Sequence, residues 1–191
     1  MKTIILIAVA SISILACNSD DKQSQETSVT GTDTSQTEAQ ASPGVNSINP
    51  IKEVVSSYLN LKNALANDDG KAAALAGSAV QKAIANADTA SFSADQKKMF
   101  AEVNEDAIEH AEHIAANATN IEHQREHFET LSKDLYDMVK AFGTSQTLYQ
   151  THCPMYNKNK GANWLSETKE VKNPYFGSKM LTCGEVKEQI N

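Results

Sequence analysis

The residues best suited to chemistry lie near the C-terminus of the 191-residue chain. Cys153 and Cys183 each have a methionine close by, in the spacings C-x-M to Met155 and M-x-x-C from Met180. His152 adds an imidazole next to Cys153. Thiolate, thioether and imidazole donors together suit soft ions, Cu(I) first and Zn(II) less well. These five residues therefore form a candidate copper site.

The same two cysteines also have a structural interpretation. Two cysteines in an exported protein usually form a disulfide. Closing a loop of ~30 residues in this way stabilises a fold by roughly 3–4 kcal/mol. Met155 and Met180 would then fill gaps in the core. The spacing alone leaves both interpretations open, a Cu(I) site and a disulfide-stabilised interaction module.

Four histidines form a secondary candidate set. His110 and His113 are spaced i, i+3, while His123 and His127 are spaced i, i+4. Each pair can face one way on a helix, and the i, i+4 spacing suits chelation of a metal ion. The alternative is a polar, pH-sensitive face on which the histidines contact the glutamates between them. The H-E-x-x-H pattern of zinc proteases is absent from the sequence.

Composition and motifs argue against several classes of function. The sequence lacks G-x-S-x-G, P-loop, G-x-G-x-x-G and C-x-x-C patterns, so we expect no enzymatic activity. The net charge is −7, from 17 basic and 24 acidic residues. An acidic chain repels nucleic acid and tolerates cations, so nucleic acid is not an expected partner.

The N-terminal region predicts export and lipidation. Residues 1–16 combine Lys2 with an apolar run that is too short to span a bilayer, as in a signal peptide. The run ends in a lipobox-like pattern, so Cys17 is the expected lipidation site. The alternative is an ordinary signal peptide with a cysteine just past its cleavage site. Residues 17–49 are rich in Ser, Thr, Gln and Asp, which predicts a flexible tether.

Residues 50–191 predict one mainly α domain, an up-down four-helix bundle with an irregular, short-strand segment packed on it. Apolar residues recur at helical spacing in four stretches, and Leu75 falls on the stripe of the second. These stretches are 51–65, 72–87, 100–118 and 121–142. The expected caps are Asn49-Pro50, Asn67–Gly70, Ser93 with Gln96, Thr119–Glu122 and Gly143.

After Gly143 the helical pattern ends. Residues 147–153 and 179–182 are predicted as two short strands. We expect Trp164, Tyr175 and Phe176 to pack on the bundle, because so short a segment cannot make a core of its own.

Several motifs of this chain resemble the DUF3347 family. They are Tyr58–Leu65, Ile121–Phe128, His152–Met155, Gly161–Ser166 and Asn173–Gly184. The resemblance spans roughly residues 50–187, and its C-terminal motifs are the specific part. Similar domains end the periplasmic adaptor subunits of CusB-type heavy-metal efflux systems. The resemblance therefore implies metal handling, with copper as the expected ion.

These observations predict a lipoprotein of the bacterial cell envelope that binds or transfers Cu(I) and contacts metal-efflux proteins. Its membrane attachment would be through the lipid on Cys17 alone, on the periplasmic or surface side of the outer membrane. The thiolates of Cys153 and Cys183 would bind the ion, with Met155, Met180 or His152 completing the site.

Overall fold

The computed structural model describes residues 49–191 of this chain. The expected signal peptide, the lipidation site Cys17 and the tether up to residue 48 lie outside the described residues. None of the helices between residues 49 and 191 combines the length and hydropathy that a membrane span requires.

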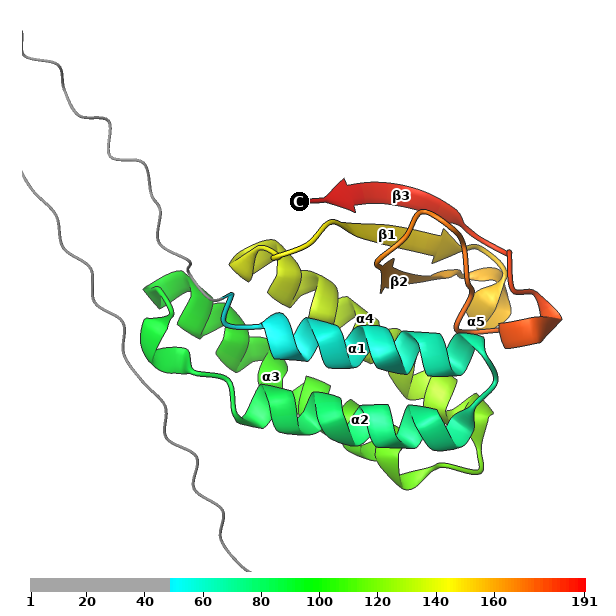
Figure 1. Cartoon of the computed structure of the whole chain (residues 1–191), viewed down its shortest axis with the longest axis horizontal. Coiled ribbons are helices and arrows are strands. Elements are labelled where there is room, and N and C mark those ends of the chain that lie inside the picture. The colour runs from blue at the N-terminus through cyan, green and yellow to red at the C-terminus, as the bar shows by residue number, and fades with distance from the viewer. Residues whose placement is uncertain (1–48) are drawn as a thin grey trace, which may run out of the picture. The chain divides into compact units, whose positions relative to one another are not determined.

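Across residues 49–191, four long helices form the bundle that the sequence predicts. They are α1 (Lys52–Ala66), α2 (Gly70–Ala85), α3 (Ala94–Ala116) and α4 (Ile121–Phe142). Helices that follow one another in the chain pack side by side, as in an up-down bundle (Figure 1). The long stretch from 94 to 142 is broken at 117–120 into α3 and α4, as expected.

Local capping explains where the helices begin. The carboxylate of Asp69 accepts a hydrogen bond from the backbone N–H of Ala72 at the start of α2. Ser93 and Gln96 form a reciprocal capping box at the start of α3. The side chain of Asn120 accepts from the N–H of His123 at the start of α4. Each cap satisfies a backbone donor that the first turn of a helix leaves without a partner.

Three details differ from the sequence prediction. The first helix begins at Lys52 rather than at Pro50, because the Asn49 side chain accepts from the N–H of Ile51 in a turn before the helix. Asn120, not Thr119, caps α4. Leu75 is 76% exposed, because the smaller residues Ala73, Ala74 and Gly77 of α2 face the neighbouring helices instead.

The C-terminal segment forms a three-stranded antiparallel sheet in the order β2-β1-β3. The strands are β1 (Leu148–Cys153), β2 (Ala162–Ser166) and β3 (Glu185–Ile190). The predicted strand at 147–153 is confirmed. The predicted strand at 179–182 is wrong, because a 3-10 turn, η2 (Gly177–Lys179), and a further turn occupy that stretch. Short helices α5 (Tyr156–Asn159) and η1 (Thr89–Ser91) lie in the connections.

The sheet packs on the side of the bundle formed by α1 and α4 (Figure 1). A chain of aromatic contacts joins the two layers. Tyr58 of α1 stacks on Phe128 of α4 at 5.2 Å, Phe128 contacts Tyr175 at 5.6 Å, and Tyr175 contacts Trp164 of β2 at 5.9 Å. The expected packing of the tail on the bundle is therefore confirmed for Tyr175 and Trp164, and Phe176 is partly buried against the same core.

A buried hydroxyl completes this junction. The hydroxyl of Tyr58 hydrogen-bonds with Ser132 Oγ at 2.8 Å and accepts from the backbone N–H of Leu165 at 3.1 Å. The sheet is thus held against α1 and α4 by both apolar packing and directional polar contacts.

Candidate metal sites

Cys153 and Cys183 meet at one end of the sheet. Cys153 is the last residue of β1 and is fully buried, while Cys183 lies partly exposed in the turn before β3. Their Sγ atoms are 3.0 Å apart, and neither is part of a disulfide among the described residues. The structure therefore brings together two thiols that are 30 residues apart in the chain.

A buried asparagine positions the turn that carries Cys183. The side chain of Asn173 is fully buried and donates to the backbone oxygen of Cys183 at 2.7 Å. Its Oδ1 accepts from the N–H groups of Tyr175 and Phe176. Because Tyr175 is anchored in the aromatic junction, the turn bearing Cys183 is tied to the core.

Cys153 affects the ionisation of Cys183. The hydrogen bond with Cys153, burial and the charge that Cys153 would carry raise the pKa of Cys183 to about 11. The Cys183 thiol is therefore protonated at neutral pH, and a metal ion that binds it must displace its proton.

The other three predicted ligands of the copper site lie around the thiols in different ways. Met180 shares the turn of Cys183, whose N–H donates to the Met180 carbonyl at 3.0 Å. Met155 follows Cys153 by two residues and is 50% exposed. His152 lies on the opposite face of β1 from Cys153, where its Nδ1 hydrogen-bonds with Asn163 at 2.8 Å. Adjacent strand residues point to opposite faces, so His152 does not join the thiols.

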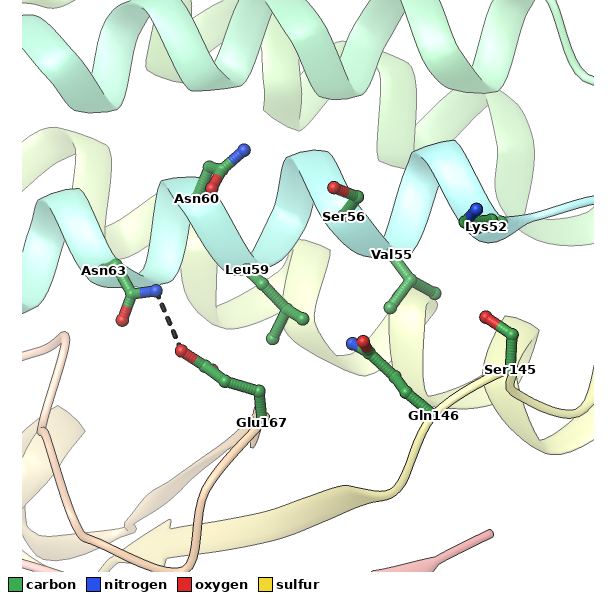
Figure 2. Close-up of a pocket in the computed structure, with 9 residues that line it drawn as sticks. All are labelled: Lys52, Val55, Ser56, Leu59, Asn60, Asn63, Ser145, Gln146 and Glu167. Carbon is green, nitrogen blue, oxygen red and sulfur yellow. Dashed lines mark hydrogen bonds between the residues drawn. The ribbon is translucent and has the colours of Figure 1, made fainter.

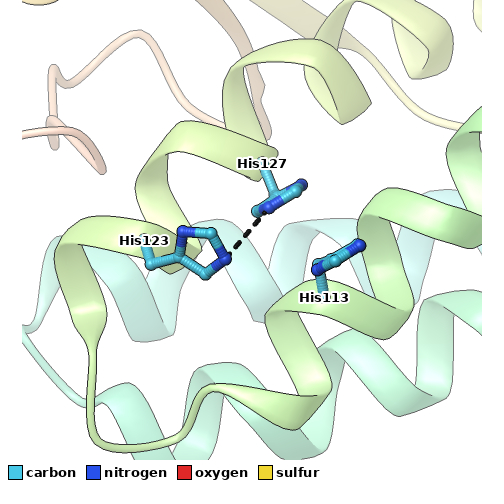
Figure 3. Close-up of side chains that lie close together, drawn as sticks. All are labelled: His113, His123 and His127. Atoms are coloured by element: carbon cyan, nitrogen blue, oxygen red, sulfur yellow. Dashed lines mark hydrogen bonds between the residues drawn. The ribbon is translucent and has the colours of Figure 1, made fainter.

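The four helix histidines converge at the α3–α4 turn. The ligand nitrogens of His113, His123 and His127 lie within 4.8 Å of one another (Figure 3). Within residues 49–191 this is the only group of three His, Cys, Asp or Glu residues with metal-binding proximity. His110 joins it from α3, with its Nδ1 2.8 Å from Nδ1 of His127.

The electrostatics of this cluster favour a neutral ring at its centre. Burial lowers the pKa of His127, and the neighbouring His113, His110 and His123 lower it further. Glu126 acts in the opposite direction. A neutral imidazole is the form that can donate a lone pair to a metal ion.

The sequence predicts these histidines on helices, as two separate pairs. A signal for their convergence was present. His113 lies four residues before Asn117 and His123 lies three residues after Asn120, so each is about one helical turn from the connection between α3 and α4. In an antiparallel helical hairpin, such positions face each other.

Two hollows on the surface of residues 49–191 contain none of the predicted ligands. One of about 290 Å³ lies between α1 and the loops before β1 and after β2, where Asn63 donates to Glu167 (Figure 2). Another of about 540 Å³ lies between α4 and strands β1 and β2. Neither contains a cysteine, histidine or methionine, so neither adds to the metal chemistry.

Comparison with known families gives one match. Residues 54–147 match the model of DUF3347, which is described as a protein of unknown function. This match supports membership in the DUF3347 family. No curated protein and no solved structure matches the chain.

The DUF3347 match covers α1 to α4 and ends just before β1. The resemblance seen in the sequence extended to about residue 187 and relied on the C-terminal motifs, which lie beyond the matched range. The histidine cluster is inside the DUF3347 match, whereas Cys153 and Cys183 are outside it.

Proposed function

We propose that this chain binds Cu(I) through Cys153 and Cys183 and takes part in heavy-metal handling or efflux in the bacterial cell envelope. The observation that carries the proposal is the 3.0 Å separation of their sulfur atoms. Thiolates are soft donors and select Cu(I) over the hard cations that carboxylates bind. A buried thiol beside a partly exposed one also gives an ion a route in from solvent.

The geometry requires a small adjustment for metal binding. Two sulfurs that each bind one ion at about 2.3 Å lie roughly 3.8 Å apart at a tetrahedral angle and roughly 4.6 Å apart in a line. The thiols must therefore separate by about 0.8–1.6 Å from their present distance of 3.0 Å. Cys153 is fixed in the strand ladder, whereas Cys183 lies in a turn, so we assign the movement to Cys183.

Met180 is the thioether that we propose as a third ligand, because its turn already links it to Cys183. Met155 is half-exposed beside Cys153, and we assign it to the entry or exit of the ion. His152 has no part in this proposal, because it faces the other side of the sheet.

The lipobox-like pattern at Cys17 supports attachment to the envelope membrane through a lipid. The resemblance to domains of CusB-type adaptors supports metal-efflux proteins as partners. In this proposal the helical bundle supports the metal site. The segment that precedes the bundle lets the domain reach an efflux partner.

The test is a Cu(I) titration of the full chain, purified anaerobically in detergent, against a chromogenic chelator. We expect one tightly bound Cu(I), two free thiols at positions 153 and 183 in the apo form, and loss of tight binding in Cys153→Ser with an unchanged helical circular dichroism spectrum. Binding by Cys153→Ser as tight as that of the unmodified chain would refute the assignment.

The alternative is a disulfide-stabilised interaction module that binds no metal. The same sulfur contact favours it, since a disulfide needs an approach to about 2.05 Å. In that case the bond would join β1 to the turn before β3, and the C-terminal segment would present a protein-binding surface. Absence of free thiols at Cys153 and Cys183 in the exported protein, together with no retained copper, would select this function.

A further inference from the structure

We propose that His113, His123 and His127 form a second metal site, which binds a divalent transition-metal ion such as Zn²⁺ or Cu²⁺. Imidazole nitrogens suit these ions better than they suit the harder Mg²⁺ and Ca²⁺. The site shares no residue with the thiol pair, so it stands whether or not that pair binds Cu(I).

The nitrogen positions fit such an ion closely. Nε2 of His123 and Nε2 of His127 are 3.2 Å apart. Two nitrogens bound to one tetrahedral Zn²⁺ at about 2.05 Å lie about 3.3 Å apart. The third nitrogen, from His113, is within 4.8 Å of both, and its side chain is 46% exposed. A small change of rotamer at His113 therefore completes a three-nitrogen site.

The remote nitrogens of the two α4 ligands already have partners. If His127 binds through Nε2, its Nδ1 faces Nδ1 of His110 at 2.8 Å, and Nε2 of His110 is 3.5 Å from Asp106. Nδ1 of His123 is 3.3 Å from a carboxylate oxygen of Glu126. Histidines that bind metals almost always donate their second N–H in this way, which fixes the tautomer and the ring orientation.

The helical hairpin holds the two helices in register at the site. Gln124, fully buried next to His123, donates to the backbone oxygens of Ile114 in α3 and Gly70 in α2. Asn117 donates to the carbonyl of His113 at 2.7 Å. The backbone on both sides of the turn is thus fixed by hydrogen bonds, and only side chains need to adjust.

The site is open to solvent on one side. The side chains of His113 and His123 are 46% and 35% exposed, while His127 is partly buried. Three protein ligands with an open fourth position distinguish this arrangement from a closed structural zinc site, which has four protein ligands. We therefore infer an exchangeable site, where water or a ligand from solution occupies the fourth position.

The test uses the full chain with Cys17, Cys153 and Cys183 changed to serine, purified in detergent without a polyhistidine tag. Titration with ZnCl₂ in a calorimeter is expected to give one Zn²⁺ per chain. The chain has five histidines, so His152→Gln is a matched control that leaves the cluster intact. Saturable binding that is lost in His123→Gln and kept in His152→Gln supports the site.

Two further variants sharpen the test. His113→Gln should weaken Zn²⁺ binding by at least about tenfold, and His110→Ala should weaken it by about 10–100-fold through the loss of its contact with His127. The proposal would be overturned if the triple-serine chain showed no saturable Zn²⁺ binding. It would also be overturned if His123→Gln bound Zn²⁺ as tightly as the chain that keeps all three histidines. If the serine variant loses its helical spectrum, the wild-type chain and its His123→Gln variant are compared instead, and His123→Gln must bind one Zn²⁺ fewer.

Discussion

Arg125 of α4 donates a hydrogen bond of 2.6 Å to the carboxylate of Asp68, in the turn between α1 and α2. The guanidinium is buried and also donates to the backbone oxygens of Pro174 and Leu65. The second oxygen of Asp68 accepts from the N–H of Ser178. These hydrogen bonds therefore hold together α4, the C-terminal end of α1 and the segment that carries Cys183.

Replacing Arg125 with methionine should destabilise the protein strongly. The change keeps most of the apolar stem but leaves two buried backbone oxygens without their donor and Asp68 without its cation. We expect the free energy of unfolding to fall by about 2–4 kcal/mol, measured by urea denaturation. Lys98→Met, which removes a positive charge from the exposed face of α3, is the control and should change stability by less than about 0.5 kcal/mol. Equal stability of the two variants would contradict this role of Arg125.

A second ion pair fastens α1 to the loop after β2. Lys62 is only 1% exposed, and its Nζ donates to Glu167 at 2.8 Å. Burial lowers the pKa of Lys62, and the contact with Glu167 opposes that shift. An ammonium group in this position needs its carboxylate, because an unpaired buried charge is costly.

Glu167→Gln should therefore lower the free energy of unfolding by about 2–3 kcal/mol. The double variant Lys62→Met/Glu167→Gln should recover much of that loss, because it removes the buried charge as well as its partner. Chemical denaturation of the single and double variants checks this. A double variant that is less stable than Glu167→Gln would show that the ion pair itself, and not the unpaired charge, decides the stability.

The helices could be predicted because their signals are local. The capping box of Ser93 and Gln96 and the cap at Asp69 involve residues three positions apart, so the sequence displays them directly. The sheet could be predicted only in part. Strand β3 was missed because all but two of its residues are exposed, as expected of an edge strand, so apolar alternation is absent.

The two sites differ in how far the sequence could define them. Nothing in the spacing of Cys153 and Cys183 determines that their sulfurs meet, because that contact depends on the path of the whole segment between them. The meeting of His113 with His123 follows from their positions about one helical turn from the connection between α3 and α4, once the helix break is accepted. The exclusion of His152 from the thiols follows from strand alternation, which needs only the confirmed strand β1.

Asp134 of α4 has a buried carboxyl group. The free-energy cost of ionising it in the folded state should appear in the pH dependence of stability. Its side chain is 6% exposed, and Oδ2 has no hydrogen-bond partner among the described residues. Burial raises the pKa of Asp134 to about 7, with further contributions from Asp106 of α3 and Asp137 of α4. Lys133 acts in the opposite direction.

The folded state therefore binds a proton at Asp134 more tightly than the unfolded chain does, whose aspartate pKa is about 3.9. Between about pH 4 and 7 the free energy of unfolding should fall as the pH rises. Asp134→Asn should remove this slope and be more stable than the unmodified chain by roughly 1–3 kcal/mol at pH 8. Thermal denaturation at pH 4 and pH 8 checks it, with the exposed Glu102→Gln as control. A slope that persists in Asp134→Asn would contradict the assignment.

Gly184 should control the position of Cys183 through its lack of a side chain. Its φ is +147°, and a Cβ there would lie 2.9 Å from Cη2 of Trp164 and 3.0 Å from the backbone oxygen of His152. Gly143 is a matched control, because its φ is +71° but a Cβ there would have nothing within 4 Å.

We expect Gly184→Ala to push the turn away from β1, move the sulfurs beyond the roughly 3.8–4.6 Å that one shared ion spans, and weaken Cu(I) binding by about tenfold or more, which corresponds to about 1.4 kcal/mol. Gly143→Ala carries a comparable backbone cost without the clash, so it should reduce stability slightly and leave Cu(I) binding unchanged. Chelator competition on both variants measures the difference. Equal Cu(I) affinity in the two variants would show that Cu(I) binding does not depend on the distance between Cys153 and Cys183. That result would contradict the proposed thiol site.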